Sequence, residues 1–163
     1  MSDWVLVALN AELDTGIAMN LMLGDCLERM KEIPDGSVDL TVTSPPYDNL
    51  RTYNNSLDWG EHVWKPVLQE LFRVTKKGGV VVWVVGDSTV NGSETGTSFR
   101  QALWAMDCGF KLHDTMIYEK NTSSFPASSK SNRYTQIFEY MFVFSKGKPK
   151  TFNGLKEKSK YGG

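Results

Sequence analysis

The sequence predicts an α/β fold in which buried strands alternate with amphipathic helices. Val80–Val85 is an unbroken apolar run, as expected for a parallel strand covered on both faces. Val38–Thr43 is a β-branched run that ends at a double proline. Between the two runs, Glu61–Thr75 places apolar residues at helical spacing, and Lys76-Lys77-Gly78-Gly79 is expected to end that helix. This alternation is typical of a doubly wound sheet.

The remaining segments continue the pattern. Leu21–Leu23 predicts a short strand that stops at Gly24-Asp25, and Cys26–Glu32 has helical spacing. Gly86–Thr97 is expected to be a polar loop, with Asp87 as a turn residue. The later elements are a helix over Ser98–Cys108 and strands over Lys111–Glu119 and Gln136–Ser145. We expect these last two strands to pair antiparallel.

Length and composition indicate one compact domain, since 163 residues with 40% hydrophobic content can bury a substantial core. We expect an N-terminal extension over residues 1–18, the main domain over 19–150 and a basic tail over 151–163. The formal net charge is −1, so any contact with nucleic acid must come from local basic patches.

Cysteine and histidine positions suggest no metal site. Cys26 and Cys108 match no ligand spacing, and His62 and His113 have no ligand-like partner. The two cysteines are expected to be reduced thiols in a cytoplasmic protein. No apolar run approaches the length of a membrane span, and no signal peptide is expected.

The sharpest chemical signal is Ser44-Pro45-Pro46-Tyr47, which follows a predicted buried strand. Open α/β sheets bind ligands at the carboxyl ends of their strands, so the motif stands where a site is expected. Two consecutive prolines fix φ and remove backbone donors, which leaves carbonyl oxygens in a stiff turn available as acceptors. The alternative interpretation is an ordinary polyproline-type surface turn.

Thr43-Ser44-Pro45-Pro46-Tyr47 resembles the signature of the DNA amino-methyltransferases, in which Asp, Asn or Ser precedes Pro-Pro and Tyr or Phe. Gly24-Asp25 upstream and the Lys-Lys-Gly-Gly-Val-Val-Val-Trp passage downstream occur in that family at these places. The resemblance covers residues 20–150. It implies a Rossmann-like methyltransferase fold with a mostly parallel sheet, S-adenosyl-L-methionine as the cofactor and DNA as the partner.

The resemblance also implies roles for particular residues. Ser44 Oγ and the Pro45 carbonyl would hold the hydrogens of an exocyclic base amino group, Pro46 would stiffen the turn, and Tyr47 would stack on a base flipped out of the duplex. The residues expected on the cofactor side are Asp25, Cys26, Thr43 and Ser44. For Asp25 a helix N-cap is an equally good interpretation, and both roles are compatible.

The residues expected to contact DNA are Arg51, Tyr53, Lys120, Lys130 and Arg133. Arg51 and Tyr53 stand in the stretch that follows the motif, as in the family. Lys120 and Arg133 flank the serine-rich segment Asn121–Asn132, and Lys130 lies near its end. The alternatives are a solvated loop arginine at Arg51 and a solubilising loop for the serine-rich segment.

The family's glycine-rich cofactor motif, Phe-x-Gly-x-Gly after an apolar strand, has no counterpart in these 163 residues. In the permuted subgroup that this motif order suggests, that motif comes late in the chain, and its strand lies beside the Pro-Pro-Tyr strand. The resemblance therefore implies an incomplete sheet with an open apolar edge. We expect either a homo-oligomer formed through that edge or a missing C-terminal half, in which case the chain is a fragment.

Two questions stay open at the level of sequence. Serine at the first motif position is, by resemblance, commoner in N4-cytosine enzymes, so cytosine is favoured and adenine N6 is the alternative. A function from another class is a cofactor-deficient remnant that acts as a nucleic-acid-binding or interaction module.

Overall fold

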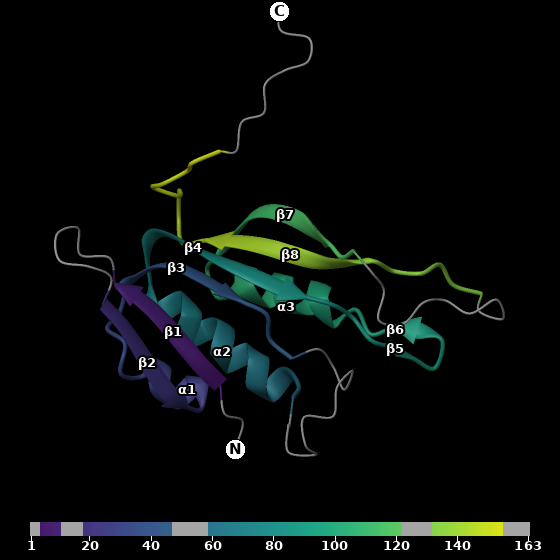
Figure 1. Cartoon of the computed structure of the whole chain (residues 1–163), viewed down its shortest axis with the longest axis horizontal. Coiled ribbons are helices and arrows are strands. Elements are labelled where there is room, and N and C mark those ends of the chain that lie inside the picture. Colours follow the sequence, from purple (N-terminus) through teal and green to yellow (C-terminus); the bar gives the residue numbers. More distant parts are fainter. Residues whose placement is uncertain (1–3, 11–17, 47–58, 122–131, 155–163) are drawn as a thin grey trace, which may run out of the picture.

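The computed structural model describes residues 4–10, 18–46, 59–121 and 132–154. Figure 1 shows a twisted sheet with two long helices on one side and a separate pair of strands beside it. The strands are β1 (Trp4–Asn10), β2 (Ala18–Gly24), β3 (Val38–Thr43), β4 (Thr75–Val85), β5 (Thr89–Val90), β6 (Ser93–Glu94), β7 (Lys111–Glu119) and β8 (Phe138–Ser145). The helices are α1 (Cys26–Met30), α2 (Glu61–Val74) and α3 (Thr97–Asp107).

The main sheet has the strand order β3-β4-β8-β7. β3 and β4 pair in parallel, with Thr43 opposite Trp83. β8 pairs antiparallel with β4 on one side and with β7 on the other. As a result β3, β4 and β7 run in one direction and β8 in the other. The predicted α/β class and the C-terminal antiparallel hairpin are confirmed.

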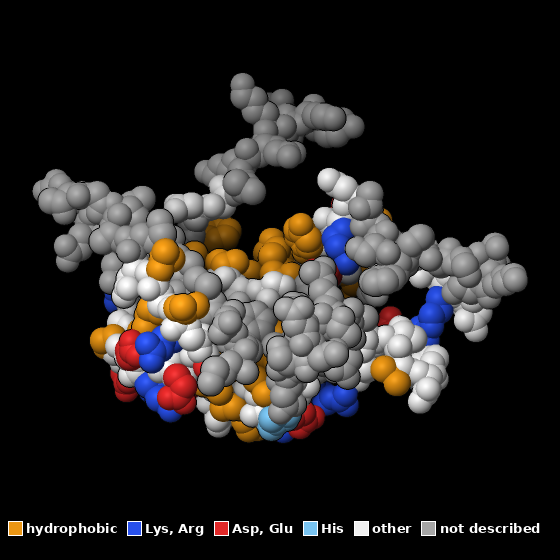
Figure 2. All heavy atoms as spheres, turned by 60° about the horizontal axis from the view of Figure 1, so that its bottom comes forward, with side chains coloured by type: hydrophobic (Ala, Val, Ile, Leu, Met, Phe, Trp, Pro, Cys, Tyr) orange, Lys and Arg blue, Asp and Glu red, His pale blue; other side chains and the backbone are white. Residues whose placement is uncertain are grey.

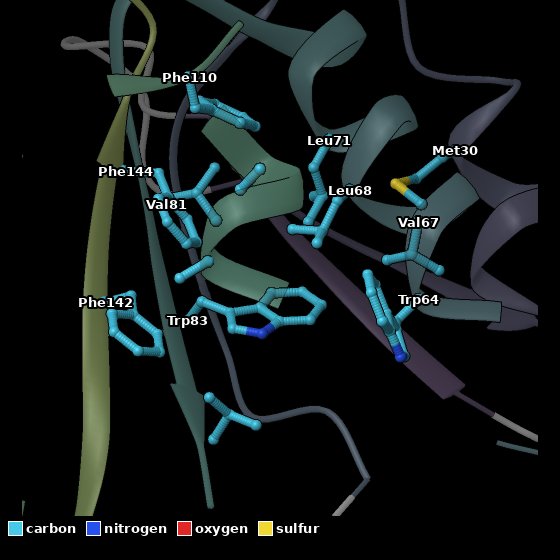
Figure 3. Close-up of a cluster of buried hydrophobic side chains, with 13 residues drawn as sticks. Met30, Trp64, Val67, Leu68, Leu71, Val81, Trp83, Phe110, Phe142 and Phe144 are labelled. Carbon is cyan, nitrogen blue, oxygen red and sulfur yellow. The ribbon is translucent and has the colours of Figure 1, made fainter. Parts of the chain in front are cut away.

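The hydrophobic core lies between the main sheet and the helices α2 and α3 (Figure 3). On β4 every second side chain faces this core, so Val81, Trp83 and Val85 are buried. On α2 the residues at helical spacing meet them, as predicted from the pattern. These buried α2 residues are Trp64, Val67, Leu68, Leu71 and Val74.

No helix among the described residues is long and apolar enough to cross a bilayer.

α2 ends at Val74, one residue from the predicted end, but it passes directly into β4 and not into a separate stop at Lys76-Lys77-Gly78-Gly79. Those residues lie inside β4. Gly78 has a φ of 87°, and its N–H donates to the Lys146 carbonyl at 2.7 Å. The β3–β4 register shifts between Val38 and Leu40, opposite this stretch. The glycine pair therefore accommodates an irregularity within a strand, because glycine tolerates a positive φ and close backbone approach.

β3 is the exposed edge of the main sheet among the described residues, so the prediction of a buried strand before the motif is wrong, whereas the open apolar edge that the resemblance implies beside this strand is present. Leu40 and Val42 are 60% and 66% exposed. No described strand is hydrogen-bonded to β3 on the side away from β4.

On β4 the side chains of Val82 and Val84 are only half-buried. The sequence predicts that β4 is covered on both faces. Among the described residues the helices cover only the face that carries Val81, Trp83 and Val85, and the face that carries Val82 and Val84 is left partly exposed.

β1 and β2 form an antiparallel sheet of their own, with Trp4 opposite Gly24 and Asn10 opposite Ala18. The predicted strand at Leu21–Leu23 is confirmed as the end of β2. β1, which pairs with β2, therefore lies within the segment expected to be an N-terminal extension.

Arg73, near the end of α2, ties the connection between α1 and β3 to the core. Its guanidinium donates to the carbonyl oxygens of Met30 at 2.7 Å and Ile33 at 3.0 Å. It also pairs with the carboxylates of Glu70 and Asp35. Hydrogen bonds to Glu70 and then Asp35 raise the pKa of Arg73 still further above its ordinary value. This side chain therefore helps to set where β3 begins.

Candidate functional site

Several predicted site residues lie at the carboxyl edge of the main sheet, the rim at which its parallel strands end. β3, β4 and β7 end at this edge, and β8 begins there because it runs antiparallel to its neighbours. Ser44 follows β3, Asp87 comes shortly after β4, Lys120 follows β7, and Arg133 precedes β8. In Figure 1 these strand ends point toward the right of the molecule. The carboxyl edge of an open α/β sheet is the usual place for a ligand.

The Ser44-Pro45-Pro46 segment, which belongs to no helix or strand, is set partly into the protein. Ser44 is exposed, whereas Pro45 and Pro46 are both buried. Buried rings do not fit the alternative of a polyproline-type surface turn, which leaves prolines in solvent. Because each proline fixes φ and lacks an N–H, the turn is stiff and holds Ser44 at the surface, within reach of a ligand. Tyr47 lies outside the described residues.

A buried polar pair supports the strand beside this turn. Trp83, which stands opposite Thr43 in the register, donates its indole N–H to the side-chain oxygen of Gln101 on α3 at 2.8 Å. Each of the two residues is 1% exposed. The bond anchors the end of β4 to α3, because breaking it would leave a polar atom buried without a partner. Sequence reasoning missed this pair; a polar residue on the apolar face of α3 was the available signal.

Asp25 and Cys26 lie where β2 meets α1. Asp25 is the N-cap of α1, and its carboxylate accepts the Leu27 N–H at 2.9 Å, so the capping interpretation is confirmed. Burial, and secondarily the Asp25 charge, raise the pKa of the Cys26 thiol to about 11. A thiol in this state is neutral and unreactive at neutral pH. A contact between either residue and a cofactor stays a prediction.

Asp87 does more than the turn residue that the sequence predicts. Its carboxylate accepts hydrogen bonds from the Ser98 N–H at 3.0 Å, the Thr95 hydroxyl at 3.2 Å and the Ser98 hydroxyl. α3 begins after Gly96, which has no side chain to cap the helix. Asp87 therefore supplies the missing cap from the end of β4, and the carboxylate also suits the positive end of the helix dipole. Sequence spacing hides this role because the partners lie 8 and 11 residues away.

Two of the five predicted DNA contacts are described, and both bind within the protein. Lys120 Nζ pairs with Glu139 at 2.8 Å, and the Arg133 guanidinium donates to the Gly92 carbonyl. Arg51, Tyr53 and Lys130 lie outside the described residues. Figure 2 shows acidic and basic side chains interspersed on the face that carries the helices. That mixture does not favour binding of a polyanion there.

Known proteins match this chain closely. A family model of DNA methylases of the N6/N4 type matches residues 38–163. The orphan methyltransferase M.BamHII of Bacillus amyloliquefaciens is 64% identical over 131 residues, which are 79% of this chain and 46% of that protein. The type II methyltransferase M.SfiI of Streptomyces fimbriatus is 29% identical over 82% of this chain and 37% of its own length. The chain thus spans less than half of these two curated relatives.

Solved structures share the fold. The cytosine-N4-specific PvuII DNA methyltransferase matches with a TM-score of 0.65 at 22% identity, over 78% of this chain and 49% of that one. A protein of Thermus thermophilus described as a DNA modification methylase, complexed with S-adenosyl-L-methionine, matches with a TM-score of 0.57 at 26% identity, over 84% of this chain and 57% of its own. The Rossmann-like methyltransferase fold is therefore confirmed. Because the family model covers most of its length, the chain belongs to the N6/N4 family of DNA methylases.

Proposed function

We propose that this chain is the catalytic part of a cytoplasmic DNA methyltransferase that transfers a methyl group from S-adenosyl-L-methionine to the exocyclic amino group of a base. The observation that carries the proposal is the Ser44-Pro45-Pro46 turn at the carboxyl end of β3, with both prolines buried and the serine exposed. Family membership supplies the context in which such a turn acts on DNA.

The turn suits the geometric problem of this reaction. The lone pair of an exocyclic amino group is delocalised into the base, so acceptors must hold the two amino hydrogens and direct the lone pair at the methyl donor. Ser44 Oγ and the Pro45 carbonyl are such acceptors, and the stiff turn holds them without further ordering. Tyr47 follows directly and offers a flat face on which a flipped base can stack.

The residues present fit one side of S-adenosyl-L-methionine. Asp25 is an exposed carboxylate at the end of a strand, suited to accept hydrogen bonds from the adenine amino group or the ribose. Cys26, whose thiol is neutral, follows the end of β2, and Thr43 is the last residue of β3. When bound, the cofactor supplies an electrophilic methyl group; the residues of this chain position the amino nitrogen that receives it. The glycine-rich motif that would hold the methionine end is not among the 163 residues.

Cytosine N4 is the favoured target and adenine N6 the alternative. This preference rests on Ser44, because serine at the first motif position is, by resemblance, commoner in N4-cytosine enzymes. Mass spectrometry of DNA from cells that express the complete reading frame distinguishes the products, because N4-methylcytosine and N6-methyladenine are separate species. Detection of N6-methyladenine alone would overturn the cytosine assignment and keep the reaction class.

Substitution of Ser44 tests the proposed site. Ser44→Ala removes one acceptor, and we expect kcat to fall by about 10²- to 10³-fold, the usual loss for one preorganised hydrogen-bonding group. Ser37→Ala is the matched control, because Ser37 stands at the other end of β3 and its hydroxyl donates to a nearby backbone group, the Pro34 carbonyl, at 2.7 Å. Equal activity of the two variants would refute the role given to Ser44.

The second candidate is a remnant that binds nucleic acid without catalysis, favoured by the open edge at β3 among the described residues. Calorimetric titration of the chain with S-adenosyl-L-methionine separates the two. Binding at micromolar concentration supports the enzyme. If binding is absent both from this chain and from the protein expressed from its complete reading frame, the remnant is the better account.

The exposed edge also supports a proposal about partners. Leu40 and Val42 on β3 and the half-buried valines of β4 form an apolar surface next to strand backbone that no other described strand pairs with, an arrangement that favours association. We expect a second copy or a complementing C-terminal half to bind there. A stable monomer in light scattering, with full affinity for S-adenosyl-L-methionine, would contradict both versions.

A further inference from the structure

A small hairpin projects from the carboxyl edge just beyond β4. β5 and β6 pair antiparallel, with Thr89 opposite Glu94 and Val90 opposite Ser93. The Asn91-Gly92 turn between them has positive φ values of 50° and 79°, as a two-residue hairpin turn requires. All six residues are exposed. The hairpin therefore contributes nothing to the hydrophobic core.

The base of this hairpin is nevertheless anchored firmly. The Thr95 N–H donates to the Ser88 carbonyl at 2.9 Å, which closes the hairpin at its foot. Asp87 binds Thr95 and Ser98, so one carboxylate joins the foot of the hairpin to the start of α3. Arg100 of α3 donates to the Thr95 carbonyl at 2.7 Å.

A further bond reaches the tip itself. Arg133, from the segment that precedes β8, donates to the Gly92 carbonyl. An isolated two-stranded hairpin is marginally stable at best, so these contacts hold it in one orientation. A projecting element that is exposed yet fixed is suited to contact a partner without a large cost in ordering.

Most groups at the tip are of the kind that contacts a nucleic-acid backbone; Val90 and the acidic Glu94 are the exceptions, and the Arg133 guanidinium beside Gly92 supplies a positive charge. The residues of the tip are Thr89, Val90, Asn91, Gly92, Ser93 and Glu94. Phosphates are contacted by Ser, Thr and Asn side chains and by backbone N–H groups. Protein interfaces instead are enriched in aromatic residues, Met and Arg and depleted in Ser. In Figure 2 the right-hand projection is mostly white, with a hydrophobic group in orange and basic side chains nearby.

We propose that the β5–β6 hairpin contacts the DNA backbone beside the Ser44-Pro45-Pro46 turn, and that Asp87 is the positioning residue that holds it there. The proposal rests on the proposed function, since it concerns how the substrate of that reaction is held. The topology supports it, because β3 and β4 pair in parallel and both lead into this edge. A base flipped toward Ser44 leaves its flanking phosphates near the same edge.

An isosteric change of charge at the tip tests the contact. Asn91→Asp adds one negative charge, and aspartate tolerates the positive φ of this position. We expect the dissociation constant for a mixed-sequence DNA duplex at low salt to rise about threefold to tenfold, with a smaller difference at high salt. Gln69→Glu is the matched control, because it adds the same charge at an exposed position on α2, where we expect no more than a twofold change. Equal affinities of the two variants would overturn the proposal.

Asp87→Asn tests the positioning role. The amide keeps one acceptor oxygen for the Thr95 hydroxyl and the Ser98 N–H. It no longer accepts the Ser98 hydroxyl at its other end and carries no charge at the start of α3, so the hold of residue 87 on Ser98 is weakened. We expect KM for DNA to rise with little change in KM for S-adenosyl-L-methionine, in the protein expressed from its complete reading frame. A fall in melting temperature with both KM values unchanged would assign Asp87 a purely structural role and overturn this part.

These outcomes distinguish a failure of the proposed hairpin contact from a failure of the proposed function. A wild-type protein that binds no DNA and transfers no methyl group refutes the proposed function. A wild-type protein that methylates DNA, with an Asn91→Asp variant of unchanged affinity, refutes only the hairpin contact. If Asn91→Asp instead alters the association of protein chains and leaves DNA affinity intact, the hairpin binds protein and the proposal fails.

Discussion

The buried Trp83–Gln101 hydrogen bond allows a quantitative test by a double-mutant cycle. Gln101→Met removes the acceptor with little change in length, and Trp83→Phe removes the donor. Both parent residues are 1% exposed and 2.8 Å apart, so no water replaces a lost partner in the intact packing. Each single change leaves one polar group buried and unpaired, which costs about 1–3 kcal/mol.

Trp83→Phe also deletes part of a core ring, and we add about 1–2 kcal/mol for that lost packing. The expected losses in the free energy of unfolding are then about 1–3 kcal/mol for Gln101→Met and about 2–5 kcal/mol for Trp83→Phe. The double variant has no unpaired group left. We therefore expect it to be more stable than the sum of the single effects predicts by about 2–6 kcal/mol, the two unpaired-group penalties together.

Urea unfolding of the four proteins, followed by far-ultraviolet circular dichroism, measures this coupling without relying on tryptophan fluorescence. The signal is independent of the substituted indole, and the slope with urea shows whether each protein unfolds in the same two-state manner. Effects that add to within about 0.5 kcal/mol would refute the reasoning, because they would show that the bond has no stabilising role.

Other consequences concern the helix caps, the thiol, the arginine and the sheet edge. Asp25→Ser should keep α1 capped and the melting temperature within about 2 °C, yet weaken calorimetric binding of S-adenosyl-L-methionine; unchanged binding would remove Asp25 from the cofactor site. The pKa of Cys26 is raised to about 11, so the neutral thiol favours the folded state, and its contribution to the free energy of unfolding should be lost as the pH rises from 9 towards 11. Alkylation of Cys26 at pH 8 should also be slower in the folded protein than in the unfolded chain, and equal rates would contradict this. Arg73→Met should lower the free energy of unfolding by about 2–4 kcal/mol, because the Met30 and Ile33 carbonyls lose a charged donor, whereas a loss under about 1 kcal/mol in urea unfolding would show that they find other partners. Val42→Lys on the exposed edge should reduce self-association in light scattering without loss of helical signal, and an unchanged oligomeric state would place any association elsewhere.

Local pattern was sufficient for most elements of this chain. The predicted strand over Lys111–Glu119 coincides with β7, and the predicted helix over Ser98–Cys108 differs from α3 by one residue at each end. Periodicity identifies such segments because each must present an apolar face to the core at the spacing of its own backbone. The Ser44-Pro45-Pro46 segment likewise follows β3 as predicted, since proline chemistry acts on the residues immediately around it.

Tertiary structure decided what those elements meet. The apolar residues of Val38–Thr43 read as a buried strand, yet β3 is an edge, because burial depends on which strands lie beside it and not on its own letters. Asp87 read as a turn residue, and only the folded chain brings it to Thr95 and Ser98 at the start of α3. The sequence by itself determined the local elements and the chemistry of the motif. The cap of α3 and the anchoring of the hairpin arise from contacts between residues that are not neighbours in the chain, which no local pattern encodes.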